Sequence, residues 1–241
     1  MFKAPGFPNC DLRTAFVFPR ECARLHLAGA NFAGADLTGW NFEDARLGRA
    51  DFTGAILRKA RFKGALLISA QLKNADLSEA SLERANLAGA EMSGAVLTSA
   101  VATDASFRGA VLRGARFDGC RLDRADLSKA DFETAQMKSA ALNSSILAGA
   151  NFARADFSGW DLTGCDFTQC SLEGAQFRKS ILDKTRFDRT NARKAVFDQA
   201  RLTNGLAVGS DFEGASFQCA QVEGMSFSQC RLDGADLSSS R

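Results

Sequence analysis

The sequence has no tyrosine, a single histidine, and only three prolines, all before residue 20. With His26 as its one imidazole and no cysteine beside it, a nucleophile–base pair has little support. No apolar run approaches the roughly 18 residues of a membrane span, and the N-terminus lacks a charged and then apolar signal segment. These absences predict a cytoplasmic protein without a histidine-based catalytic site.

The chain also lacks an excess of either charge. Its 30 basic and 28 acidic residues give a net charge of +2. Such a balance predicts no general attraction to nucleic acid or to anionic membranes.

A five-residue repeat dominates what is present. Residues 27–40 and 147–160 share eleven of fourteen positions, and each contains a shorter pattern centred on Leu or Phe. If this central position is called i, 43 centres follow one another from Leu27 to Leu237 without insertion or deletion, and 39 are Leu, Phe or Met. Position i−2 is almost always small, mostly Ala, and eighteen of the 21 glycines fall at i+2.

A period of five fits neither a helix nor a flat strand. Steps of five spread around a helix axis, and on a strand they alternate between faces. The pattern instead predicts a chain that turns a corner every five residues, with i inside, i−2 filling the remaining space and glycine at i+2 allowing positive φ. Where Arg, Lys or Ser stands at i+2, we expect a type I-like corner. Four corners close a coil of 20 residues, so the 43 units make about 10.75 coils, a rod of about 50 Å at ~4.8 Å per coil.

Units such as Ala35–Gly39, ADLTG, and Ala125–Lys129, ADLSK, resemble the A(D/N)LXX consensus of the pentapeptide-repeat family. The likeness extends over nearly the whole chain. It implies an all-β fold, a right-handed quadrilateral β-helix of about 10–11 coils. The handedness comes from this resemblance.

The two ends differ in composition. Residues 1–25 hold all three prolines and four phenylalanines, Phe2, Phe7, Phe16 and Phe18, and are predicted to form an N-terminal cap, with a flexible tail as the alternative. Residues 26–241 are predicted to form one continuous β-helix. Regular units run to Leu237, so an open last coil would expose apolar cross-section and strand edges, which predicts a homodimer through the C-terminal coil.

Trp40 and Trp160 occupy i−2, where the interior normally takes Ala, and lie six whole coils apart in one column. An indole is not expected to fit there beside the central residue. The rings are therefore either surface anchors for a partner or corner variants copied by duplication of a 120-residue block.

Cysteine and carboxylate positions favour no chemistry. Six of the seven cysteines fall at i−2 or i, where they would be small buried fillers, and Cys219 at i+2 is expected to be exposed. No spacing is typical of a metal site, and a bridge between Cys165 and Cys170 is geometrically possible. Fifteen units carry Asp or Asn at i−1, where these side chains can support turns. We expect no catalytic, cofactor-binding or metal-binding residues and no small-molecule substrate. We expect the thiols to be reduced.

One of the four faces differs in charge. The first face (centres Phe32, Phe52), the second (Leu37, Leu57) and the third (Phe42, Phe62) have seven or eight acids and six or seven bases each, whereas the fourth (Leu47, Leu67) has three acids and six bases. Its outward positions predict a candidate partner-binding face consisting of Leu66, Ile68, Ile146, Leu206, Val208, Arg46, Arg49 and Arg108. The alternative is that apolar side chains merely favour strand surfaces.

Three functions fit these features. The first is a non-catalytic binding or scaffold rod acting on an unidentified protein partner. The resemblance implies two alternatives: a DNA mimic that binds or protects type II topoisomerases, which needs a strongly negative rod and is disfavoured by the charge of +2, and a bacterial regulatory or secretion-system accessory protein.

Overall fold

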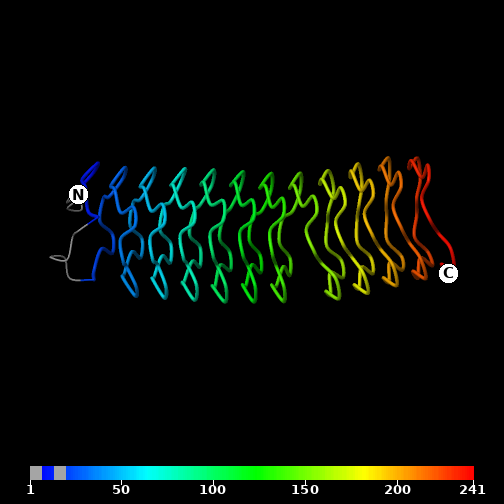
Figure 1. The fold of residues 1–241 in the computed structure, drawn as a ribbon, viewed down its shortest axis with the longest axis horizontal. Helices are drawn as coiled ribbons and strands as arrows, with labels where there is room; N and C mark the ends of the chain where they lie inside the picture. The colour runs from blue at the N-terminus through cyan, green and yellow to red at the C-terminus, as the bar shows by residue number, and fades with distance from the viewer. Residues whose placement is uncertain (1–6, 14–19) are drawn as a thin grey trace.

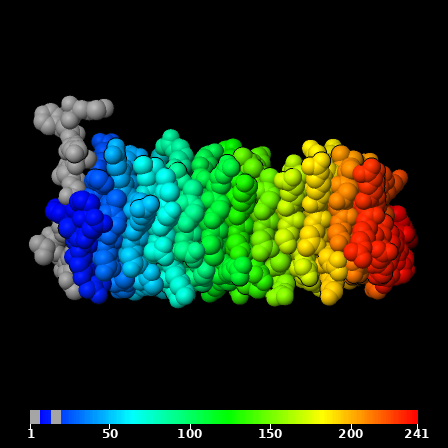
Figure 2. Space-filling model, turned by 90° about the horizontal axis from the view of Figure 1, so that it is seen from above, coloured from blue at the N-terminus to red at the C-terminus, as the bar shows by residue number. Residues whose placement is uncertain are grey.

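The computed structural model describes residues 7–13 and 20–241, which wind into a rod of stacked square coils (Figure 1). Over this described part there is no helix and no extended strand. Each face of each coil instead contributes one residue, at i−1, to isolated parallel bridges with the residues 20 before and 20 after it. The series begins with Asp11 and Asn31 and ends with Ser216 and Asp236. The sequence order therefore follows the rod axis, as the colours of Figure 2 show.

The interior consists of the central residues. Every central side chain from Leu27 to Phe217 is buried. Phenylalanines one coil apart stack, with ring centroids 4.8 Å apart for Phe32 and Phe52 and 4.9 Å for Phe177 and Phe197. This distance matches the spacing of neighbouring strands. The predicted square coil with a column of Leu and Phe inside it is confirmed.

The corners are all of one kind. From Cys22 to Leu237 the central carbonyls other than those of Leu202 and Ala207 accept a hydrogen bond from the amide three residues later, as Ala35 N to Phe32 O at 3.0 Å. The φ angle at i+2 is positive in every unit from Arg24 to Ser239. This is the geometry of a type II turn. The prediction of type I-like corners at Arg, Lys and Ser was wrong: Arg49 has φ 58°, and its amide donates to Ile68 O of the next coil at 3.0 Å. That bond requires the positive φ and offsets the roughly 1–2 kcal/mol that a left-handed residue costs.

The acidic and amide side chains at i−1 support these corners. All fifteen accept a hydrogen bond from the backbone N–H two residues later, among them Asp126 from Ser128 at 3.0 Å and Asn86 from Ala88 at 3.1 Å. The predicted role of this position in the turn is confirmed.

Replacing Asp126 by alanine should therefore lower the stability of the rod by about 1–2 kcal/mol, because the hydrogen bonds from the Ser128 amide and hydroxyl are both lost. Asp126→Asn should be nearly neutral, because the amide oxygen of Asn86 makes the same contact with a backbone N–H two coils earlier. Urea denaturation followed by circular dichroism measures both. Equal losses for the two variants would contradict the role of the side-chain acceptor.

The ladder opens at one place. The 20-residue period requires three further bridges that are not formed: Gln136/Asp156, Ala141/Asp161 and Ile146/Asp166. Every other pair of this spacing from Asn31 to Asp236 is bridged. We call the interval between residues 136–147 and 156–167 the seam. The first face stays closed beside it, since Asp131 and Asn151 are bridged and the rings of Phe132 and Phe152 stack at 4.9 Å. Figure 1 shows the seam as one wider interval along the lower edge of the rod.

The predicted boundary at residue 25 stays a prediction, because residues 1–6 and 14–19, including Phe2, Phe16 and Phe18, lie outside the described residues. Residues 7–13 join the ladder, with Phe7 N bonded to His26 O at 2.8 Å. At the other end the side chains of the last coil are less covered: Val222, Phe227 and Leu232 are half-buried, and Leu237 is 40% exposed.

Candidate protein-binding face

The fourth face presents the five predicted apolar side chains to solvent. Leu66, Ile68, Leu206 and Val208 are 39–46% exposed and Ile146 is 56% exposed. They stand outside because i−1 and i+1 flank the inward central residue on a strand-like segment, where neighbours alternate in direction. Parallel bridges place Arg46 next to Leu66, and Arg186 next to Leu206. Leu66 and Ile146 are four coils apart, and Ile146 and Leu206 three.

Arginines on this face differ from those elsewhere in their ion pairs. Across the described residues, Arg46, Arg49, Arg108 and Arg189 form no ion pair, whereas the other faces pair most of theirs. The pairs on the other faces include Arg61–Glu43 at 3.0 Å, Arg124–Asp104 at 2.6 Å and Arg193–Glu213 at 2.8 Å. The cause is the low number of acids on the fourth face, where Arg186–Asp188 is an exception. Unpaired guanidinium groups beside exposed aliphatic side chains are available to an acidic and apolar surface of another molecule.

The structure buries one of the two predicted tryptophan anchors and leaves the other partly exposed. Trp40 is 7% exposed and packs near Phe42, with ring centroids 6.0 Å apart, so its assignment as an anchor was wrong. It fits because it lies at the N-terminal end of the core, near Phe7, Leu12 and Cys22, where no complete coil competes for the space. Trp160, in the middle of the rod, is half-buried, and its ring meets Phe157 edge to face at 5.4 Å.

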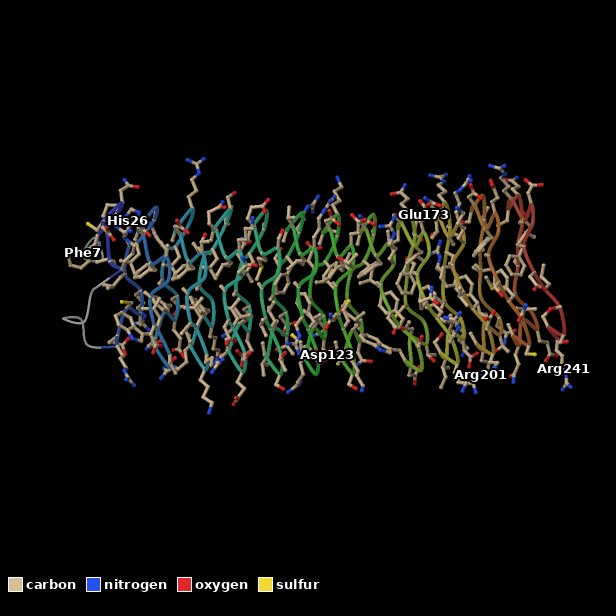
Figure 3. The ribbon with its side chains drawn as sticks, in the orientation of Figure 1. Phe7, His26, Asp123, Glu173, Arg201 and Arg241 are labelled. Carbon is tan, nitrogen blue, oxygen red and sulfur yellow. The ribbon has the colours of Figure 1, made fainter. Side chains whose placement is uncertain are left out.

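The remaining chemical groups are dispersed. All seven cysteines are free, Cys219 is exposed as predicted, and burial raises the pKa of Cys120 and Cys170 to about 12, so these thiols stay protonated at neutral pH. His26 is exposed at the first coil (Figure 3). Within residues 7–13 and 20–241, no group of three or more His, Cys, Asp and Glu is arranged to hold a metal ion. Of the charged side chains labelled in Figure 3, Glu173 lies on the upper side of the rod, and Asp123 and Arg201 lie on the lower side.

Two features were not found from the sequence. Ile56, on the second face, is 39% exposed, as much as Val208, so exposed apolar groups are not confined to the fourth face. The seam was also missed, and its one signal was the tryptophan at an alanine position. No helix in the described ranges is long and apolar enough to cross a membrane.

A parallel ladder with a 20-residue period, square corners and a filled interior defines a β-solenoid repeat protein. Models of pentapeptide repeats match residues 26–64, 45–84, 65–101, 75–114, 103–138 and 130–169, and a model of the pentapeptide repeat region matches residues 160–237. The chain belongs to the pentapeptide-repeat family, and its fold is the right-handed quadrilateral β-helix.

Solved structures similar to this chain are also pentapeptide-repeat proteins. One is HetL, involved in heterocyst differentiation regulation in the cyanobacterium Nostoc sp. strain PCC 7120. It is 24% identical, with 98% of this chain and 91% of HetL covered and a TM-score of 0.48. Another is full-length QnrB1, a plasmid-mediated fluoroquinolone resistance protein, at 16% identity, with 99% and 91% covered and a TM-score of 0.28. No curated protein sequence matches the chain. The likeness to these structures concerns the fold alone.

Proposed function

We propose that this protein is a non-catalytic binding rod that holds a partner protein on its fourth face. The observation that supports this is the combination of exposed Leu66, Ile68, Ile146, Leu206 and Val208 with unpaired arginines on the face that is poorest in acids. The partner surface that would fit carries apolar side chains flanked by carboxylates. A rigid coil stack keeps these groups at fixed spacing, which lowers the ordering cost of binding.

The test is capture of the partner by the tagged protein from a lysate of its source, followed by mass spectrometry. Replacing Leu66, Ile68, Ile146, Leu206 and Val208 by glutamate should lower the amount of captured partner at least about tenfold, because truncation of central interface residues commonly costs 2 kcal/mol or more. Ile56→Glu is the matched control, since Ile56 has similar exposure on the second face. Capture that is unchanged in the five-residue variant, or lost equally in the control, would refute the assignment of the face.

The charge distribution does not favour a DNA mimic. On each of the first three faces the acids outnumber the bases by two or fewer, and on the fourth face the bases outnumber the acids by three. A rod that competes with DNA for a cationic groove needs a strongly negative surface.

The predicted end-to-end dimer remains a second, independent proposal. A copy meeting the last coil would cover Val222, Phe227, Leu232 and Leu237, which are less buried than the central residues before them.

A further inference from the structure

The seam leaves backbone N–H donors without hydrogen-bond partners on both coils that border it. Elsewhere the amides of i and i+2 donate hydrogen bonds to carbonyls of the next coil. The amide of i−1 donates a hydrogen bond to a carbonyl of the preceding coil. Eight of these bonds are missing at the seam in the described chain, and their amides have no acceptor in the protein. On the first coil these are the amides of Met137, Ser139, Leu142, Ser144 and Leu147, and on the second coil those of Asp156, Asp161 and Asp166. Open strand edges of this kind pair with other chains.

Trp160 is the structural cause of the opening. Apart from Trp40 near the N-terminal end, the other residues at this corner from Ala60 to Ala220 are small, and Ala60, Ala80 and Ala100 are fully buried. The indole takes up space on the side of the preceding coil, where it lines one cleft together with Ala140 and another together with Met137. On its other side the ladder is intact, with Ile181 N bonded to Trp160 O at 2.7 Å. The ring therefore separates two coils that would otherwise close.

Three clefts follow the seam around the rod. One of about 580 Å³ is lined by Met137, Lys138, Arg154 and Trp160 among others, one of about 450 Å³ continues past Trp160 to Leu142, and one of about 390 Å³ lies between Leu142 and Cys165. Each falls within the range of about 300–1,000 Å³ that ligand sites occupy.

Carboxylates outnumber bases along these clefts. The lining residues include four acids and two bases: Asp118, Asp156, Asp161, Asp166, Lys138 and Arg154. The base Arg154 already contacts Glu133, at 3.6 Å. A hydrogen bond from the Thr163 hydroxyl, at 2.6 Å, lowers the pKa of Asp161, so this carboxylate is ionised at neutral pH. The charge favours a cationic occupant.

We propose that the seam binds a basic polypeptide segment, which follows the coil around its corners and pairs with the open coil edges through β-bridges. The unpaired amides and the carbonyls opposite them supply the main-chain bonds, the indole of Trp160 supplies an apolar contact, and the carboxylates select basic side chains. This site lies on the second, third and fourth faces. It is distinct from the candidate partner-binding face, although Ile146 borders both.

The chain itself supplies a defined probe. A synthetic peptide of residues 56–67, ILRKARFKGALL, carries four basic and no acidic side chains and corresponds by period to residues 136–147, four coils later. In the Trp40→Phe variant Trp160 is the one remaining tryptophan, so its fluorescence reports on the seam. Binding should shift its emission to shorter wavelength and slow hydrogen exchange of the eight seam amides at least about tenfold.

Two control peptides separate strand pairing from adsorption. Methylation of the amide nitrogens of Leu57, Phe62 and Leu67 removes donors, and replacement of the four bases by glutamate reverses the charge; both changes should weaken binding at least about tenfold. Binding of the methylated peptide as tight as that of the original would overturn the proposal. So would the absence of a fluorescence shift up to ~1 mM peptide, the limit of weak association, or a shift without protection of the seam amides. Loss of binding in Trp160→Ala would support it.

Discussion

Trp160→Ala should stabilise the protein, whereas the same substitution at Trp40 should destabilise it. Removing the Trp160 indole lets the seam close and forms up to eight backbone hydrogen bonds, each worth about 0.5–1.5 kcal/mol. The lost burial of a half-buried ring costs less, about 1–2 kcal/mol. Trp40 separates no paired coils, and its nearly complete burial predicts a loss of about 3–5 kcal/mol.

Denaturation in guanidinium chloride, followed by far-ultraviolet circular dichroism, measures both variants against the parent chain. The expected gain for Trp160→Ala is at least about 2 kcal/mol after both contributions are combined. A loss of stability in both variants would mean that Trp160 fills the core without separating the coils.

Phe177→Ala should cost about 3–5 kcal/mol, the usual range for a buried phenylalanine. Its ring is fully buried and stacks on Phe157 at 5.1 Å and on Phe197 at 4.9 Å, so truncation leaves a cavity in a continuous column. Because each coil contacts only its neighbours, the loss should be concentrated in residues 157–197.

Phe177→Leu is the control, since leucine occupies the neighbouring centres Leu172 and Leu182 with full burial. Its cost should remain below about 1.5 kcal/mol. Thermal denaturation and local hydrogen exchange distinguish the two variants. An alanine variant as stable as the leucine variant would place the ring outside the column.

The fold could be predicted from the sequence because one period imposes one geometry. A Leu or Phe every fifth residue cannot face inward on a helix or a flat strand, and the fifteen Asp and Asn residues mark the turns independently. The exposure of Leu66 and Ile146 followed from their positions in the same frame.

Features that depend on neighbouring coils were less accessible. The positive φ of Arg49 follows from a hydrogen bond to the next coil rather than from its own preference. The same residue type at the same corner gives a buried ring at Trp40 and an open seam at Trp160, because one lies at the end of the core and the other between two coils. A repeat pattern defines the period but not the local room for an indole.

Hydrogen exchange of the free protein, resolved to single amides by NMR, tests the central claim most directly. A square ladder interrupted once predicts slow exchange for the amides of i, i+2 and i−1 along the rod. It predicts fast exchange for those of Met137, Ser139, Leu142, Ser144, Leu147, Asp156, Asp161 and Asp166. Uniform protection across residues 136–167 would contradict the seam, and fast exchange of the central amides throughout would contradict the coil.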